Sequence, residues 1–86
     1  MDDLKELRRK IDAMDEQILL LFSERAKICR AIGAAKKKQG APIRNADREN
    51  EVFQHIKEKA ARLGLDSIQV ERIYREIVNM CSSVQE

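Results

Sequence analysis

The sequence is short of aromatic residues. It contains no tryptophan, and Phe, Trp and Tyr together make up 3% of its 86 residues. Aliphatic side chains must therefore form the core. No apolar run approaches the length of a membrane span, and the opening Met-Asp-Asp is unlike the start of a secretory signal peptide. We therefore expect a cytoplasmic protein.

Positive charge is not in large excess either. Lysines and arginines number 17 against 15 acidic residues, so the net charge at pH 7 is only +2. Proteins that hold nucleic acids or anionic membranes by massed charge carry a larger surplus. We expect neither a nucleic-acid nor a membrane partner, and any functional cation here must act individually.

Residues that bind metals are scarce. The two cysteines, Cys29 and Cys81, are far apart and lack metal-ligand spacing, and the single histidine, His55, has no partner at metal-ligand or triad spacing. Both cysteines have aliphatic neighbours, so we expect reduced thiols that pack as small hydrophobic side chains. The sequence predicts no metal site.

Residues 4–38 carry the strongest pattern in the chain. Apolar side chains recur at heptad spacing and predict a helix with one apolar seam. The seam consists of Leu4, Leu7, Ile11, Met14, Ile18, Leu21, Ile28, Ile32 and Ala35. Such a helix is roughly 50 Å long, whereas a compact chain of this size has a radius of gyration of about 12 Å. The helix cannot be buried within its own chain, so its seam must meet another chain.

Capping residues mark the ends of three helices. The N-cap candidates are Asp3, Asn45 and Asp66, and the glycines that end the first two helices are Gly40 and Gly64. Gly33 lies inside the first helix, where we expect another backbone to approach closely. No segment alternates with period two, so no strand is expected. The sequence predicts an all-α fold, with residues 1–86 as one domain: a long N-terminal helix and two shorter helices, with the long helices of two chains side by side.

A few polar residues lie where the pattern points inward. Arg25 replaces an aliphatic residue of the seam, and a permanently charged guanidinium there calls for an anionic partner. Lys36 lies eleven residues further on and, at ~100° per residue, points within about 20° of the same direction. Glu49 and Gln85 lie on the apolar stripes of the second and third helices. Each of these residues also has an ordinary interpretation, as a register-setting, capping or surface side chain.

Arg8 is an ordinary surface arginine unless two chains pair. It lies seventeen residues before Arg25, so the two are about 25 Å apart on one helix. In an antiparallel pair of long helices, Arg8 of one chain can approach Arg25 of the other. Arg44 and Arg48 are interpreted as an exposed edge of the second helix, and for Arg44 that interpretation is kept.

This set of side chains suits a particular kind of chemistry. Several cations, one carboxylate and one amide, without a nucleophile or a glycine-rich phosphate loop, do not make a hydrolase or a transferase. They suit a cage for a small polyanion. A reaction in such a cage must be one that the substrate undergoes by itself once it is folded correctly, with the enzyme supplying orientation and preorganised charge.

The residues resemble a known family, the all-helical (AroQ) class of chorismate mutases. The resemblance covers essentially the whole chain and is carried by Leu7-Arg8-x-Lys10-Ile11-Asp12, Asp15, Leu21, Glu24-Arg25, Ile32-Gly33-x-x-Lys36, Pro42-Ile43 and Asp47-Arg48-Glu49. It implies an intertwined homodimer with two active sites that converts chorismate to prephenate in phenylalanine and tyrosine biosynthesis. The reaction in that family is an intramolecular Claisen rearrangement without metal or cofactor.

The resemblance also implies a role for each residue singled out. Arg25 and, from the other chain, Arg8 would hold the two carboxylates of the substrate, with Arg48 assisting. Lys36 and Gln85 would donate to the ether oxygen, whose negative charge grows as the carbon–oxygen bond breaks. Glu49 would accept from the ring hydroxyl, aided by the backbone near Asn45. Cys81 stands where many relatives have a serine donor, so either Ser82 replaces that contact or it is lost.

Two other interpretations remain open at this stage. The same scaffold could act as an isochorismate pyruvate-lyase. Related helical proteins have this activity on a similar dicarboxylate. The chain could also be a non-catalytic helical dimerisation module of a larger protein. Product analysis with both substrates, and the effect of replacing Arg25 or Lys36, would separate these possibilities.

Overall fold

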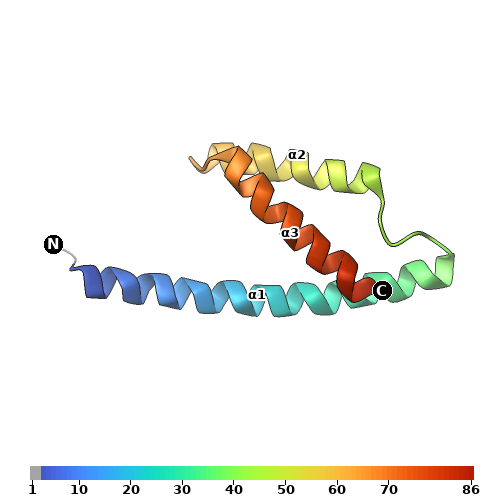
Figure 1. Cartoon of the computed structure of the whole chain (residues 1–86), viewed down its shortest axis with the longest axis horizontal. Helices are drawn as coiled ribbons and strands as arrows, with labels where there is room; N and C mark the ends of the chain where they lie inside the picture. Colours follow the sequence, from blue (N-terminus) through green and yellow to red (C-terminus); the bar gives the residue numbers. More distant parts are fainter. Residues whose placement is uncertain (1–2) are drawn as a thin grey trace.

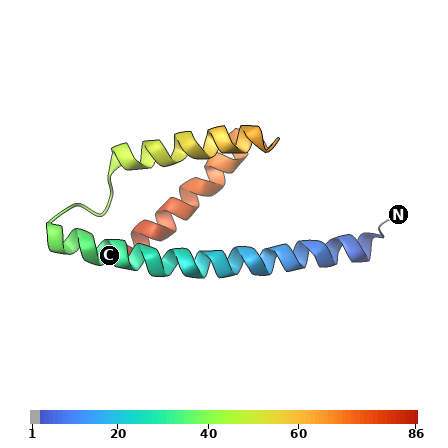
Figure 2. The ribbon, with the colours of Figure 1, turned by 180° about the vertical axis from the view of Figure 1, so that it is seen from behind.

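The computed structural model describes residues 3–86 and contains three helices in this range, α1 (Leu4–Gln39), α2 (Ala46–Arg62) and α3 (Ser67–Gln85) (Figure 1). The all-α prediction is confirmed, and the predicted first helix is correct to within one residue at its end. α1 runs the full length of the molecule, α2 lies on the opposite side, and α3 crosses diagonally between them (Figures 1 and 2).

Local sequence explains where each helix begins. Asp3 accepts a hydrogen bond from the Glu6 amide at 2.8 Å, and Asn45 accepts one from the Arg48 amide at 3.0 Å. Asp66 accepts from the amides of Ile68 and Gln69 at 3.0 and 3.1 Å. In each case a short polar side chain satisfies amides that have no partner within the helix. All three predicted N-caps are confirmed.

The first two helices end at glycines in the left-handed conformation. Gly40 has φ 69° and Gly64 has φ 74°. The amides that follow turn back onto the last helical carbonyls, Ala41 to Lys36 and Leu65 to Ala60, both at 2.9 Å. Glycine adopts this backbone without the steric cost of a Cβ atom, so the sequence directs the chain to reverse at these two positions.

α3 holds the chain together. It packs against both α1 and α2, whereas α1 and α2 make no helix–helix contact within residues 3–86. Among the described residues the buried hydrophobic side chains are only Cys29, Phe53, Ala60 and Ile77. A single chain therefore has little core of its own.

The apolar seam of α1 is exposed. Its members from Leu4 to Ile32 are between 42% and 64% accessible, and Arg25 is the half-buried interruption among them. The molecule measures 57 Å along its longest axis and has a radius of gyration of 16.2 Å, against the about 12 Å expected of a compact chain of this length. The expectation that the first helix cannot be buried within its own chain is thus confirmed. None of the helices in residues 3–86 is long and apolar enough to cross a lipid bilayer.

The prediction for the cysteines was wrong. Cys29 on α1 and Cys81 on α3 form a disulfide that links residues 52 positions apart, with their Cα atoms 5.3 Å from each other. Neither side chain is therefore a reduced thiol. The bond became possible because α3 crosses α1 at this point, which the spacing of two cysteines in a sequence does not reveal.

Candidate functional site

A pocket of about 360 Å³ lies between the three helices, a size within the range of small-molecule sites. Residues of α1, α2, α3 and the connector between α1 and α2 line it. They are Arg25, Ile28, Cys29, Ile32, Lys36, Ile43, Asn45, Arg48, Glu49, Val52, Val78, Cys81, Ser82 and Gln85. Of the predicted site residues, only Arg8 is missing from this wall.

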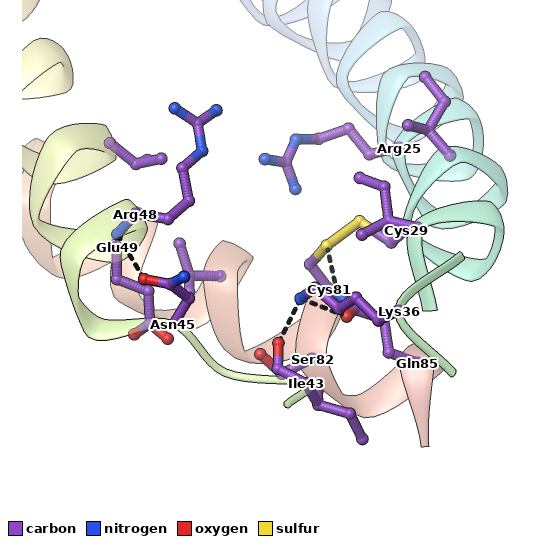
Figure 3. A pocket seen from close by; sticks show the side chains of 14 residues that line it. Arg25, Cys29, Lys36, Ile43, Asn45, Arg48, Glu49, Cys81, Ser82 and Gln85 are labelled. Atoms are coloured by element: carbon purple, nitrogen blue, oxygen red, sulfur yellow. Dashed lines mark hydrogen bonds between the residues drawn. A yellow bond between two sulfur atoms is a disulfide. The ribbon is translucent and has the colours of Figure 1, made fainter. Parts of the chain in front are cut away.

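Lys36 and Gln85 meet at one end of the pocket (Figure 3). The Lys36 Nζ donates to the Gln85 Oε1 at 2.8 Å and also to the carbonyl oxygen of Ile43. The Gln85 Nε2 donates to the Cys81 Sγ at 3.3 Å. An ammonium has three N–H donors and an amide nitrogen has two, so each group keeps one donor for a ligand. The two side chains come from positions 49 residues apart and together form a polar corner.

Gly33 makes this corner possible. A Cβ atom on Gly33 would lie 2.9 Å from both the Cα and the Cβ atoms of Gln85. No such atom fits there without a shift of the helices, since carbon atoms pack at about 3.5–4.0 Å. The close backbone approach predicted at Gly33 is confirmed, and it brings the last turn of α3 directly onto α1, next to Lys36.

Two guanidinium groups face the pocket from opposite sides. Arg25 extends from α1 and Arg48 from α2, and both point into the open space above the disulfide (Figure 3). Arg25 is half-buried, whereas the Arg48 side chain is 71% exposed and one of its nitrogens lies 3.4 Å from Glu51. That i,i+3 pair is exposed and of the kind that contributes little energy, so it does not prevent Arg48 from turning to an anion.

Glu49 lines the pocket from α2 and is held by Arg44. The Arg44 Nε and Nη2 donate to the two carboxylate oxygens at 3.0 and 2.9 Å. The hydrogen bond from Arg44 lowers the pKa of Glu49, opposed by partial burial and aided by the positive charges of Arg44, Lys36 and Arg75. Glu49 is therefore a carboxylate that accepts hydrogen bonds.

The remaining polar groups of the wall are Asn45 and Ser82. The Asn45 side chain caps α2, so its oxygen already accepts from the Arg48 amide. Cys81 lies in the wall, but its sulfur is in the disulfide and has no S–H to donate. Cys81 therefore supplies no donor, and the hydroxyl of the neighbouring Ser82 is the alternative donor in this part of the wall.

Arg8 lies outside the pocket of its own chain. It is exposed on the first turns of α1, far along the helix from Arg25. This placement agrees with the expectation that one chain cannot bring both arginines to the same ligand.

Sequence reasoning missed two contributors to the site. The Ile43 carbonyl, which orients Lys36, is a backbone group and leaves no signature in a sequence. Arg44 was interpreted as an exposed edge residue, yet it binds Glu49 with two donors and the Asn79 Oδ1 with a third at 3.1 Å. A possible signal was its position directly before the N-cap, from which a long side chain can reach the first turn of the helix.

The sequence profile of chorismate mutase type II matches residues 7–86. The chain is 41% identical to the bifunctional chorismate mutase/prephenate dehydratase of Aquifex aeolicus, over 100% of this chain and 25% of that protein. It is 26% identical to the chorismate mutase of Methanocaldococcus jannaschii, over 100% of this chain and 87% of that one. It thus spans about a quarter of the bifunctional relatives.

A solved structure has the same fold. A conserved hypothetical protein from Pyrococcus furiosus superimposes with a TM-score of 0.77 at 32% identity, over 96% of this chain and 95% of that one. The match to the sequence profile and the shared fold therefore both cover nearly the whole chain. This protein belongs to the chorismate mutase type II family.

Proposed function

We propose that this chain is a chorismate mutase that rearranges chorismate to prephenate, in the route to phenylalanine and tyrosine. The observation that carries the proposal is the convergence of the spare donors of Lys36 and Gln85 on a pocket flanked by two arginines. Membership of the chorismate mutase type II family supports it. The names of the relatives quoted above support it further.

The reaction needs little from the protein beyond shape and charge. Within one chorismate molecule the ether carbon–oxygen bond breaks while a new carbon–carbon bond forms, so no group enters or leaves and no electrons are exchanged with a cofactor. The barrier falls if the side chain is held over the ring and if the charge that develops on the ether oxygen is stabilised. We propose that this chain uses no metal and no cofactor.

The arginines would supply the shape. Arg25 and Arg48 face each other across the pocket, and a dicarboxylate held by both would be fixed in a folded conformation. Guanidinium groups bind carboxylates with two parallel hydrogen bonds, which fixes orientation as well as position. In this proposal Arg8 of a second chain is the third cation.

Lys36 and Gln85 would supply the charge. Each keeps one free donor after its contacts within the chain, and both donors belong to the same corner of the pocket. A donor aimed at an oxygen that becomes negative is typically worth on the order of 10²–10³ in rate. The Gln85 amide donates without any change of protonation, so this contact does not depend on pH.

Glu49 would select the substrate. Its carboxylate lines the pocket and stays ionised near neutral pH, so it would accept from the ring hydroxyl of chorismate, with the backbone near Asn45 assisting. Ser82 would replace the donor that the disulfide removes at Cys81. These assignments make Arg8, Arg25, Arg48, Asn45, Glu49 and Ser82 binding residues, with Lys36 and Gln85 acting at the reacting atoms.

We propose that the functional unit is a homodimer. The support is the exposed seam of α1, the small core of one chain and the half-buried cation in the seam. Burial of the eight seam side chains from Leu4 to Ile32 against an equivalent helix would add apolar contacts worth about 25 cal/mol per Å² of buried surface. We further propose that residues 1–86 form one domain that works in the cytoplasm.

The direct experiment is to add pure protein to chorismate and follow the loss of chorismate absorbance, with a chelator present and no cofactor added. We expect turnover with prephenate as the product. Production of pyruvate from isochorismate, without turnover of chorismate, would assign the chain to the lyase reaction instead. No turnover of either substrate would leave the dimerisation module and refute the proposal.

A further inference from the structure

Arg44 stands apart from the other arginines because its guanidinium makes three hydrogen bonds, two to Glu49 and one to Asn79. It lies in the connector, directly before the Asn45 N-cap of α2. Its guanidinium reaches forward to both oxygens of Glu49, at 3.0 and 2.9 Å, and across to the Asn79 Oδ1 on α3 at 3.1 Å. Arg44 itself does not line the pocket, whereas Glu49 does.

The geometry of these bonds is directional. Two parallel N–H groups of one plane meet the two oxygens of the carboxylate, an arrangement that fixes the rotation of both groups and that a lysine ammonium cannot reproduce. The third bond anchors the guanidinium to Asn79 of α3, a residue 35 positions away in the sequence. Through Arg44, the carboxylate of Glu49 is thereby held relative to the connector and to α3.

We propose that Arg44, anchored by Asn79, is a positioning residue that aims the Glu49 carboxylate at the hydroxyl of the substrate. The inference rests on the proposed function. Each carboxylate oxygen has two lone pairs, and Arg44 occupies one on each, so both oxygens can still accept from a ligand. Arg44 would therefore set hydroxyl recognition without touching the substrate.

The charges around Glu49 come from every side of the site. Arg44 approaches from the connector, Lys36 from α1 and Arg75 from α3, and Arg48 precedes Glu49 on α2. Of these, Arg44 alone makes hydrogen bonds to both Glu49 oxygens, and its hydrogen bond is the largest cause of the lowered pKa of Glu49. Loss of Arg44 should therefore change both the orientation and the titration of the carboxylate.

The test compares Arg44→Gln and Arg44→Lys with the wild-type protein on two substrates: chorismate and an analogue with hydrogen in place of the ring hydroxyl. For chorismate we expect kcat/KM to fall on the order of 10- to 100-fold in both variants, mostly through KM, because the contact lies away from the bonds that change. For the analogue the fall should be less than about threefold, since that substrate does not use Glu49. An equal loss on both substrates would mean that Arg44 is merely structural and would overturn the inference.

Asn79→Ala should give the same pattern in weaker form, because it removes the anchor and leaves the ion pair. The matched control is Arg62→Gln, an arginine in the last turn of α2, distant from the pocket wall. It removes the same charge and should leave both substrates unaffected. Circular dichroism of each variant confirms that the fold is retained.

A second readout does not require activity. With the glutamate carboxyl carbons labelled with ¹³C, NMR titration follows the ionisation of Glu49 in the wild-type protein and in Arg44→Gln. We expect the pKa of Glu49 to rise toward the ordinary glutamate value in the variant and to stay lowered in Arg62→Gln. An unchanged titration would overturn the positioning role even if the enzyme is active. An absence of turnover in the wild-type protein would instead overturn the proposed function, and the titration would still show whether Arg44 holds the Glu49 carboxylate.

Discussion

Replacing Gly33 by alanine sets two effects of similar size against each other. In an exposed helix the change stabilises by about 1 kcal/mol, because alanine has the better helix propensity. Here the new Cβ atom would lie 2.9 Å from the Cα and Cβ atoms of Gln85, which belong to the last turn of α3. Because one of the two contacts is backbone, a rotation of the Gln85 side chain cannot relieve it.

The displacement that follows can be estimated. Carbon atoms pack at about 3.5–4.0 Å, so the end of α3 must move away from α1 by roughly 0.6–1 Å. Overpacking of this kind costs about 1–3 kcal/mol, which offsets the gain in helix propensity. We therefore expect the free energy of unfolding to fall by no more than about 2 kcal/mol. The same movement separates Lys36 from Gln85, and a displacement near 1 Å in a reacting site can cost about 10²-fold in rate.

The assay measures kcat/KM with chorismate and chemical unfolding in parallel, and Gly40→Ala is the matched control. A Cβ atom at Gly40 meets nothing within 4 Å, but the φ of 69° disfavours any residue other than glycine. Gly40→Ala should thus lose about 1–2 kcal/mol of stability and keep its kcat. A Gly33→Ala enzyme with full activity and increased stability would refute the reasoning about the α1–α3 contact.

Four further predictions concern the disulfide, the polar corner, the pH dependence of activity and acid unfolding. Reduction of Cys29–Cys81, or the Cys29→Ala/Cys81→Ala double substitution, should lower the free energy of unfolding by about 4 kcal/mol, because the bond closes a loop of 52 residues. Unfolding curves with and without reductant, at one fixed chain concentration, measure this change. Coincident curves would contradict the prediction. Lys36→Ala should lower kcat at least about 10²-fold through loss of a donor to the ether oxygen. Lys38→Ala, in the same last turn of α1, should leave kcat unchanged. Similar kcat values for the two variants in steady-state assays would argue against the role assigned to Lys36. Activity should be nearly flat from pH 6 to 8, since the Gln85 amide does not titrate, and a steep fall above pH 6 in the pH–rate profile would speak against Gln85 as the donor. The last prediction concerns acid pH, because the pKa of Glu49 is lowered in the folded protein. The contribution of this carboxylate to stability is complete above the ordinary pKa of 4.5 and is lost as the pH falls through the lowered value. Acid unfolding should therefore begin at a lower pH in the wild-type protein than in Arg44→Gln.

The helices could be predicted because their ends are determined locally. An Asp or Asn side chain reaches an amide two or three residues away, and a glycine permits the left-handed turn, so Asp3, Asn45, Asp66, Gly40 and Gly64 reveal the boundaries without knowledge of the fold. The exposed seam followed from the length of the first helix alone. The close contact at Gly33 could also be predicted, because a residue that disfavours helix inside a helix indicates a close neighbour.

The features that were missed depend on where α3 crosses the other helices. The disulfide requires Cys81 to come opposite Cys29, and the anchor of Arg44 requires Asn79 to face the connector. Both are consequences of a crossing position that no local pattern encodes. Lys36 and Gln85 were paired in advance only through the resemblance to a family, because periodicity places each on a helix face but does not bring two faces together.

The central claim is that two chains share each site, with Arg8 from one and Lys36 from the other. Mixing the Arg8→Ala and Lys36→Ala proteins after joint unfolding and refolding tests it directly. Random pairing makes half of the dimers mixed, and each mixed dimer has one intact site of two, so the mixture should recover about one quarter of the wild-type activity. A mixture no more active than the average of the two separate variants would contradict the claim.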